Sequence, residues 1–226
     1  LTGVRRAGKT FLLYFIIKRL LKKFNREQIL YLNFEHELMP AIDARHVRKF
    51  FQIHSELHKE EIKFILLDEI QRVRNWQLLL RRLYDEKKYH IFVTGSSSEL
   101  RPKQLASSLR GRTINYTIFP LTFKEFLRFK NYKFDQKKIL IESYKGRFLG
   151  LLREFVLFGG FPDVVIKDSV FEKRKLVFSY FDTILLRDII EKYEVRNSRL
   201  LESFLKYLIS ITSFYFSATK TENYFK

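Results

Sequence analysis

The chain has 226 residues and a formal net charge of +18, from 43 Lys and Arg against 25 Asp and Glu. The absence of cysteine excludes disulfides and thiolate metal sites, and the 24 Phe and 12 Tyr exclude a disordered chain, which is poor in such residues. A field of this sign attracts polyanions, so nucleic acid stays open as a partner beside a purely solubilising role for the charge.

The first feature in chain order is a glycine-rich loop that opens an amphipathic helix, predicted over residues 10–23. The loop fits the pattern G-x-x-x-x-G-K-[ST], in which backbone N–H groups, a lysine and the start of a helix bind phosphates. The hydroxyl that ends the pattern coordinates Mg²⁺. The predicted nucleotide-binding residues are Gly3, Val4, Arg5, Arg6, Ala7, Gly8, Lys9 and Thr10, with Thr10 also a metal ligand.

Strands and helices alternate after this helix, which is typical of a parallel sheet covered by helices. Helices are expected over residues 41–53 and 76–88. Strands are expected at residues 29–34, 63–67, 90–94 and 112–119, the last ended by Pro120.

Two carboxylates stand at the end of the most apolar of these strands, where Phe64–Leu67 is followed by Asp68 and Glu69. In open α/β sheets, ligands bind at the carboxyl ends of the strands. We therefore expect Asp68 to hold Mg²⁺ through water and Glu69 to act as general base on the attacking water.

Hydroxyls and an arginine complete the predicted site. Ser96 is the first choice and Thr94 the second for a hydroxyl that binds the γ-phosphate or the attacking water, although an ordinary Gly-Ser loop stays open. Arg112, rather than Arg110, is expected to stabilise charge on the transferred phosphoryl group, in its own subunit or a neighbouring one. A plain surface arginine is the competing interpretation.

The sequence becomes helical and rich in aromatic residues after about residue 120. Thr122 and Glu125 stand three apart before an apolar pair, which predicts a capping box and a helix start. Gly-Gly-Phe-Pro at residues 159–162 interrupts the helical pattern and is interpreted as a turn, with a hinge as the alternative.

In this order the motifs resemble the AAA+/STAND-like branch of P-loop ATPases, and more narrowly the bacterial and archaeal AAA ATPases with a DUF4143-type C-terminal region. The resemblance is carried by residues 2–10, 67–71, 94–97, 109–112, 119–126, 159–162 and 186–189. It implies an α/β fold with a P-loop NTPase parallel sheet of strand order 5-1-4-3-2, the first strand truncated. The strand at 90–94 would lie between the strands of the P-loop and of Asp68.

The resemblance also implies a domain order: an ATPase core at 1–120, a helical lid at 121–198 and the start of a winged helix at 199–226. Segments 200–211 and 216–225 would be the first two helices of the last domain. A lid arginine that senses the γ-phosphate has two candidates, Arg187 and Arg196. Both ends of the chain look cut, so a fragment of a longer protein is expected.

The residues and the resemblance together predict a cytoplasmic ATP hydrolase that couples Mg²⁺-dependent hydrolysis to a conformational switch acting on DNA or a protein. A nucleotide-gated binding module with negligible turnover stays open. Expected ligands are ATP, ADP and Mg²⁺, while DNA, a protein effector and further copies of the chain stay open as partners. No apolar run reaches the roughly 20 residues of a spanning helix, so no membrane is expected.

Overall fold

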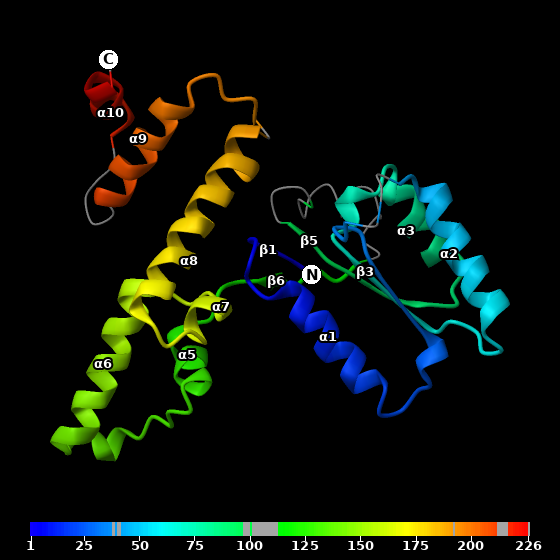
Figure 1. Cartoon of the computed structure of the whole chain (residues 1–226), viewed down its shortest axis with the longest axis horizontal. Helices are drawn as coiled ribbons and strands as arrows, with labels where there is room; N and C mark the ends of the chain where they lie inside the picture. The colour runs from blue at the N-terminus through cyan, green and yellow to red at the C-terminus, as the bar shows by residue number, and fades with distance from the viewer. Residues whose placement is uncertain are drawn as a thin grey trace. The chain divides into compact units, whose positions relative to one another are not determined.

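A computed structural model (Figure 1) describes residues 1–37, 39, 42–96, 100, 113–191, 193–211 and 217–225. It divides into two compact units, residues 1–173 and 174–226, which are taken separately here. Among the helices of the described ranges, none combines the length and apolar character that crossing a bilayer requires.

The strands of the first unit are parallel to their neighbours and form two three-stranded sheets, in the orders β5-β1-β6 and β2-β3-β4. Together with the helices around them, they make an α/β fold that is followed by a helical region. The strand bounds are Thr2–Gly3 (β1), Ile29–Asn33 (β2), Phe64–Asp68 (β3), His90–Val93 (β4), Gly95–Ser96 (β5) and Thr117–Ile118 (β6).

The two sheets meet along one run of chain, because only Thr94 separates β4 from β5. The N–H of Thr94 donates to Leu67 O on β3 (2.9 Å), and the N–H of Gly95 donates to Leu1 O beside β1 (3.2 Å). The strands therefore succeed one another as β6-β1-β5/β4-β3-β2. In this order the run from 90 to 96 lies between the P-loop strand and the Asp68 strand, whereas the single sheet expected with the order 5-1-4-3-2 is split into two three-stranded sheets.

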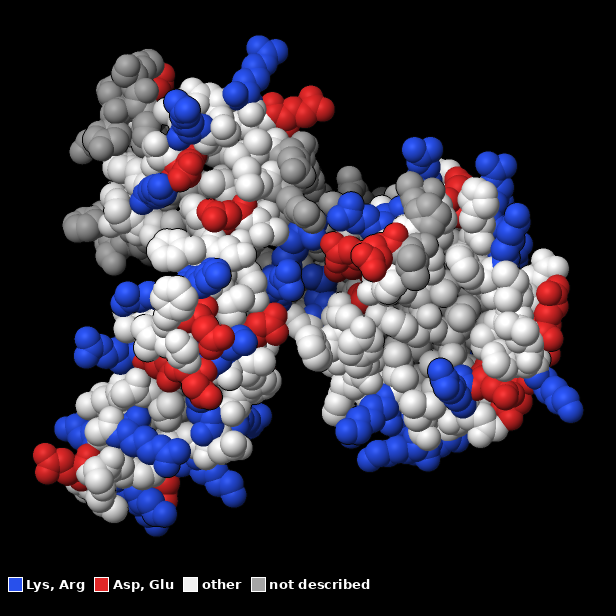
Figure 2. Space-filling view, in the orientation of Figure 1, with Lys and Arg blue, Asp and Glu red and all other residues white. Residues whose placement is uncertain are grey.

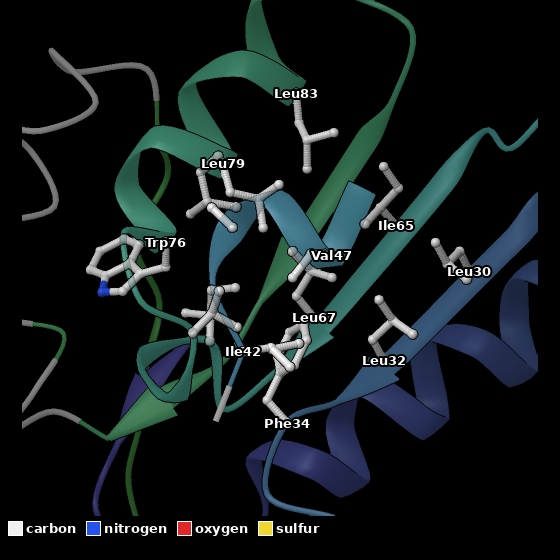
Figure 3. Close-up of a cluster of buried hydrophobic side chains, with 14 of the residues drawn as sticks. Leu30, Leu32, Phe34, Ile42, Val47, Ile65, Leu67, Trp76, Leu79 and Leu83 are labelled. Carbon is white, nitrogen blue, oxygen red and sulfur yellow. The ribbon is translucent and has the colours of Figure 1, made fainter. Parts of the chain in front are cut away.

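Helices cover both faces of β3, which explains why the strand is apolar from Phe64 to Leu67, before Asp68. Figure 3 shows Ile65 and Leu67 pointing into a cluster completed by residues of β2 and of the helices α2 and α3. On the opposite face Phe64 and Leu66 pack with Leu13 of α1. The helices of this part are α1 (Lys9–Leu20), α2 (Ala44–Leu57) and α3 (Trp76–Asp85), with 3₁₀ turns η1 (Arg26–Gln28) and η2 (Ile70–Arg72).

Two of the predicted elements have other bounds. The helix expected over 41–53 begins at Ala44, because Asp43 caps it and accepts a hydrogen bond from Arg45 N (3.0 Å). The strand expected over 112–119 was too long: β6 pairs only at Thr117 and Ile118, since β1 offers just two residues to pair with. Its outer residues, Tyr116 and Phe119 among them, are exposed.

An aromatic cluster organises the rest of the first unit. The helix α5 (Phe123–Phe129) starts in the predicted capping box of Thr122 and Glu125. Phe126 is its buried centre, contacted by Phe123 and by Phe155 of α6. The further elements are η3 (Gln136–Leu140), α6 (Glu142–Phe158) and α7 (Pro162–Val165).

The predicted break at residues 159–162 is confirmed. The helix α6 ends at Gly159, which has a left-handed φ of 73°, and α7 begins with Pro162. Gly160 is required by a close approach: a Cβ there would lie 2.0 Å from Leu121 O, the backbone just before α5. The break therefore ties α6 and α7 to the start of α5.

The second unit consists of helices and the turns between them in its described residues. Most of α8 (Val170–Thr183) belongs to it, followed by a π-helical segment, η4 (Ile184–Glu191). Then come α9 (Ser198–Ser210), capped by Asn197, and α10 (Ala218–Phe225). These last two helices overlap the segments expected at 200–211 and 216–225 but have other bounds.

Candidate functional site

The P-loop joins β1 to α1 through backbone conformations that favour glycine. Gly3 and Gly8 have φ values of 157° and 96°, and Arg6 between them is also left-handed at 64°. Gly3 is required sterically as well, because a Cβ there would lie 2.2 Å from Ile118 O on β6. The helix α1 begins at Lys9 with no side-chain cap and no acidic residue in its first turn. This is the arrangement in which a helix start binds anions.

Lys9 is buried at the centre of the site, with 5% of its surface exposed. Its ammonium donates to Gly3 O (3.2 Å) and Val4 O (3.1 Å), and lies 3.9 Å from Glu69 Oε1. Burial lowers the pKa of Lys9, and the nearby carboxylates of Glu69 and Asp68 oppose that shift. The loop thus encloses one cation beside two acids.

Asp68, 1% exposed, ends β3 with both carboxylate oxygens bonded. Oδ1 accepts from the hydroxyl of Thr94, and Oδ2 accepts from the phenol of Tyr31 on β2 (3.1 Å). Burial, then the contact with Tyr14 and the charge of Asp68, raise the pKa of Tyr31, so the phenol keeps its proton and serves as the donor. Asp68 is therefore held in place from two neighbouring strands.

Glu69 directly follows β3 in a left-handed conformation, with a φ of 54°. Its N–H donates to Thr94 Oγ1 (3.0 Å), so one threonine hydroxyl is bonded to both acidic residues. Its carboxylate accepts from Gln71 Nε2 in η2, and the residue as a whole is 9% exposed. Burial raises the pKa of Glu69, which makes it a better proton acceptor than an ordinary carboxylate.

An ion-pair network connects the P-loop to the ends of two other elements. Glu35, just after β2, lies 3.5 Å from Arg5 Nη1 in the loop and 3.6 Å from Arg72 Nη2 in η2. Because Glu35 is exposed, these pairs contribute little to stability. They do place Arg5 on the side of the loop that faces β2.

Of the remaining predicted residues, some lie at the P-loop, one lies in the second unit and others are outside the described residues. Ser96 is buried on β5, in register with Gly3, so it lies beside the P-loop. Thr10 is in the first turn of α1, and Arg196 is exposed before α9 in the second unit. Arg110 and Arg112 lie outside the described residues, as does the side chain of Arg187.

Sequence reasoning missed three residues of this site: Tyr31, Gln71 and Glu35. A signal existed for Tyr31, because it lies two residues before Asn33, which pairs with Asp68 in the parallel ladder. Residues two apart share a face of a strand, so Tyr31 belongs on the face of Asp68. Gln71 lies in the run 67–71 that carries the resemblance, but no role was expected for it or for Glu35, because their contacts depend on how turns fold.

The donor set fits a magnesium nucleotide. Among the described residues no three acidic or histidine side chains gather into a cage that could hold a metal ion alone. Magnesium in nucleotide sites needs only one or two protein oxygens, since phosphates and water supply the rest. Asp68 and the Thr10 hydroxyl are oxygen donors of this kind. The P-loop beside them begins at Gly3, where the neighbouring strand leaves no room for a Cβ atom.

Comparison with known families gives two matches. Residues 1–127 match the family described as an AAA domain, and residues 149–225 match a domain of unknown function, DUF8612. The second match thus bears another name than the DUF4143-type region implied by the resemblance.

Two curated relatives bear the name of uncharacterized proteins. The chain is 38% identical over 224 residues to a protein of Methanocaldococcus jannaschii, which covers 99% of this chain and 49% of the relative. It is 36% identical over 210 residues to a protein of Haemophilus influenzae, at 92% and 50% coverage. The chain spans about half the length of these relatives. Because the first family match extends over more than half of its residues, the chain belongs to the AAA domain family of P-loop proteins.

Proposed function

We propose that this chain binds ATP with Mg²⁺ and hydrolyses it. The observation that carries the proposal is the burial of one cation and two acids, Lys9, Asp68 and Glu69, against a glycine loop at the carboxyl ends of parallel strands. Burying three charged groups costs free energy, and a loop with only a structural role would not require that cost. A phosphate ligand would give Lys9 an anionic partner, and a magnesium ion bound with it would give Asp68 a cationic one.

The P-loop residues bind the phosphates in this proposal. Backbone N–H groups of residues 3–10 and the start of α1 donate to the phosphate oxygens, and the Lys9 ammonium exchanges the carbonyls of Gly3 and Val4 for the β- and γ-phosphates. Thr10 and Asp68 would hold a magnesium ion, and its charge would offset part of the charge of the phosphates.

Glu69 is the general base. Its burial and raised pKa suit a carboxylate that takes a proton from water near neutral pH. Ser96 remains the proposed hydroxyl for the γ-phosphate or the attacking water, whereas Thr94, with its hydroxyl on Asp68 and Glu69, positions the acids. Arg112 is proposed as the arginine that stabilises the transferred phosphoryl group.

We further propose that hydrolysis drives a conformational switch. In this scheme a core at residues 1–120 moves a helical lid at 121–198 and a winged helix that starts at 199, and the output acts on DNA or a protein partner. On the faces drawn in Figure 2, Lys and Arg side chains are spread over the surface with Asp and Glu among them. This distribution suits a general polyanion attraction more than one narrow groove.

The test compares three proteins: the wild type, Lys9→Ala and Glu69→Gln. We expect Lys9→Ala to weaken ATP binding by roughly 10- to 100-fold, because a hydrogen bond to a charged group is lost. Glu69→Gln should keep ATP affinity and lose roughly 10²- to 10⁴-fold in kcat. Fluorescent-nucleotide titration and phosphate release, each with and without duplex DNA, provide the measurements.

Each outcome selects between the functions. Unchanged turnover in Glu69→Gln would remove Glu69 as the base. ATP binding without turnover in the wild type would favour a nucleotide-gated binding module over an ATP hydrolase. Stimulation by DNA that falls steeply with salt would identify nucleic acid as the partner, and its absence would leave a protein effector or a further copy of the chain.

A further inference from the structure

The carboxylate of Glu69 has two different partners, one on each oxygen. Oε1 lies 3.9 Å from the ammonium of Lys9, while Oε2 accepts a hydrogen bond from Gln71 Nε2. Gln71 lies in η2, the turn that immediately follows Glu69, and neither the P-loop pattern nor the paired acids point to it. The question is what an amide does at this position.

The side chain of Gln71 is confined rather than free to rotate. A Cβ at Gly95 would lie 2.4 Å from Gln71 Oε1 and 2.2 Å from Leu100 Cδ1, so β5 leaves room for this amide only because residue 95 is glycine. Within the described residues, Gln71 Oε1 is buried and has no hydrogen-bond partner. The amide is therefore held by its hydrogen bond to Glu69 and by the close packing at Gly95.

The two partners of Glu69 differ in what a nucleotide would do to them. In the function proposed above, Lys9 is drawn to the phosphates and its contact with Glu69 is weakened. Gln71 is neutral and belongs to a turn on the far side of the carboxylate, so its hydrogen bond persists. A left-handed backbone at Glu69 also restricts where the carboxylate can point.

We propose that Gln71 is a positioning residue for Glu69. Its amide holds Oε2 so that Oε1 is presented to the attacking water, and Gly95 provides the space that the amide occupies. Two motifs that look independent in the sequence, Asp68-Glu69 and Thr94-Gly95-Ser96, thereby act on one carboxylate. The proposal rests on the hydrolysis proposed above, because positioning a base has a consequence only if the base is used.

The experiment uses two substitutions, Gln71→Ala and Gln71→Met, of which the second keeps the volume of the side chain. We expect both to bind fluorescent ADP within about twofold of wild type, to leave KM for ATP unchanged and to lower kcat roughly 10- to 100-fold. The matched control is Gln52→Ala, which removes an exposed glutamine–glutamate bond of 2.9 Å on α2 and should leave every constant unchanged.

A double substitution tests whether the effect passes through Glu69. In the Glu69→Gln background, Gln71→Ala should lower the residual kcat by less than about twofold, since residues that act as a unit are not additive. A second loss of the full factor there would overturn the positioning role, as would Gln71 variants that turn over at the wild-type rate.

Failure of the proposed function gives a different result. A wild-type protein without measurable hydrolysis overturns both proposals together. A wild type that hydrolyses ATP while Gln71→Ala and Gln71→Met match it in kcat overturns this one alone.

Discussion

The strand β3 and the helix α6 lie in the same unit, but they differ in how far their apolar residues are buried. Every residue of β3 is buried, because helices cover both of its faces. No residue of α6 is fully buried: its aromatic side packs on α5, while Leu149, Val156 and Leu157 on other sides are exposed. The apolar residues around β3 are thus buried by other parts of the chain, whereas those of α6 are buried only in part.

The two regions differ in how far packing within the chain determines the position of their side chains. In the core, the acids and the P-loop stand on elements packed from all sides, so their geometry is determined by the chain itself. In the helical region, apolar residues of α6 and strongly exposed ones of α8, such as Phe171 and Phe178, have no comparable cover in the described residues. Matched substitutions in the two regions test whether burial differs between them in solution.

The largest effect is expected from a pair of leucines. Leu66 in β3 is 0% exposed and Leu157 in α6 is 62% exposed. Leu66→Ala should lower the free energy of unfolding by about 3–5 kcal/mol through lost burial and a cavity, and Leu157→Ala by at most about 0.5 kcal/mol. Urea unfolding measures both. A loss of several kcal/mol for Leu157→Ala would mean that this side of α6 is covered in solution.

A smaller effect is expected at the hydroxyl shared by the two acids. Thr94→Val keeps the volume but leaves Asp68 Oδ1 and the N–H of Glu69 unpaired in the interior, which should cost about 2 kcal/mol. Thr183→Val on α8 removes an exposed bond of 2.7 Å to Ser179 O and should cost under about 0.5 kcal/mol. Equal costs in urea unfolding would contradict the buried geometry of Thr94.

The smallest effect is expected at the start of the helical region. Thr122→Ala removes the N-cap of α5 and should cost about 1 kcal/mol at pH 7. Hydrogen bonds from Thr122 lower the pKa of Glu125 below its ordinary 4.5, so its stabilising contribution is present above that pH and lost as pH falls through the lowered value. The cost of Thr122→Ala should therefore shrink in acid. A cost that stays constant down to pH 2 would exclude the capping box as its source.

The elements that were predicted well are those encoded by neighbours in the sequence. The P-loop, the buried run of β3, the capping box at Thr122 and the break at Gly159 each follow from a few adjacent residues. The length of β6 was predicted poorly because it depends on its partner strand, which offers only two residues.

The candidate site was likewise predictable where it depends on adjacent residues and not where it depends on distant ones. Lys9, Asp68, Glu69 and Ser96 were expected together because parallel strands end at one edge, and the structure brings them there. The contacts of Tyr31 with Asp68 and of Gln71 with Glu69 require the strand register and the path of a turn, neither of which a local pattern contains. Thr94 was ranked second for a role at the phosphate, and its hydroxyl is instead bonded to the acids.

The contact between Gly3 and β6 has a practical consequence for genetics. An allele that places a side chain at the first glycine of the P-loop would affect more than phosphate binding. Here a side chain at Gly3 would collide with the carbonyl of Ile118, so such an allele would disturb the pairing of β1 with β6 as well. A phenotype from a substitution at Gly3 would therefore reflect reduced protein abundance. A phenotype from a substitution at Lys9, whose ammonium lies in the proposed phosphate site, would reflect altered nucleotide binding.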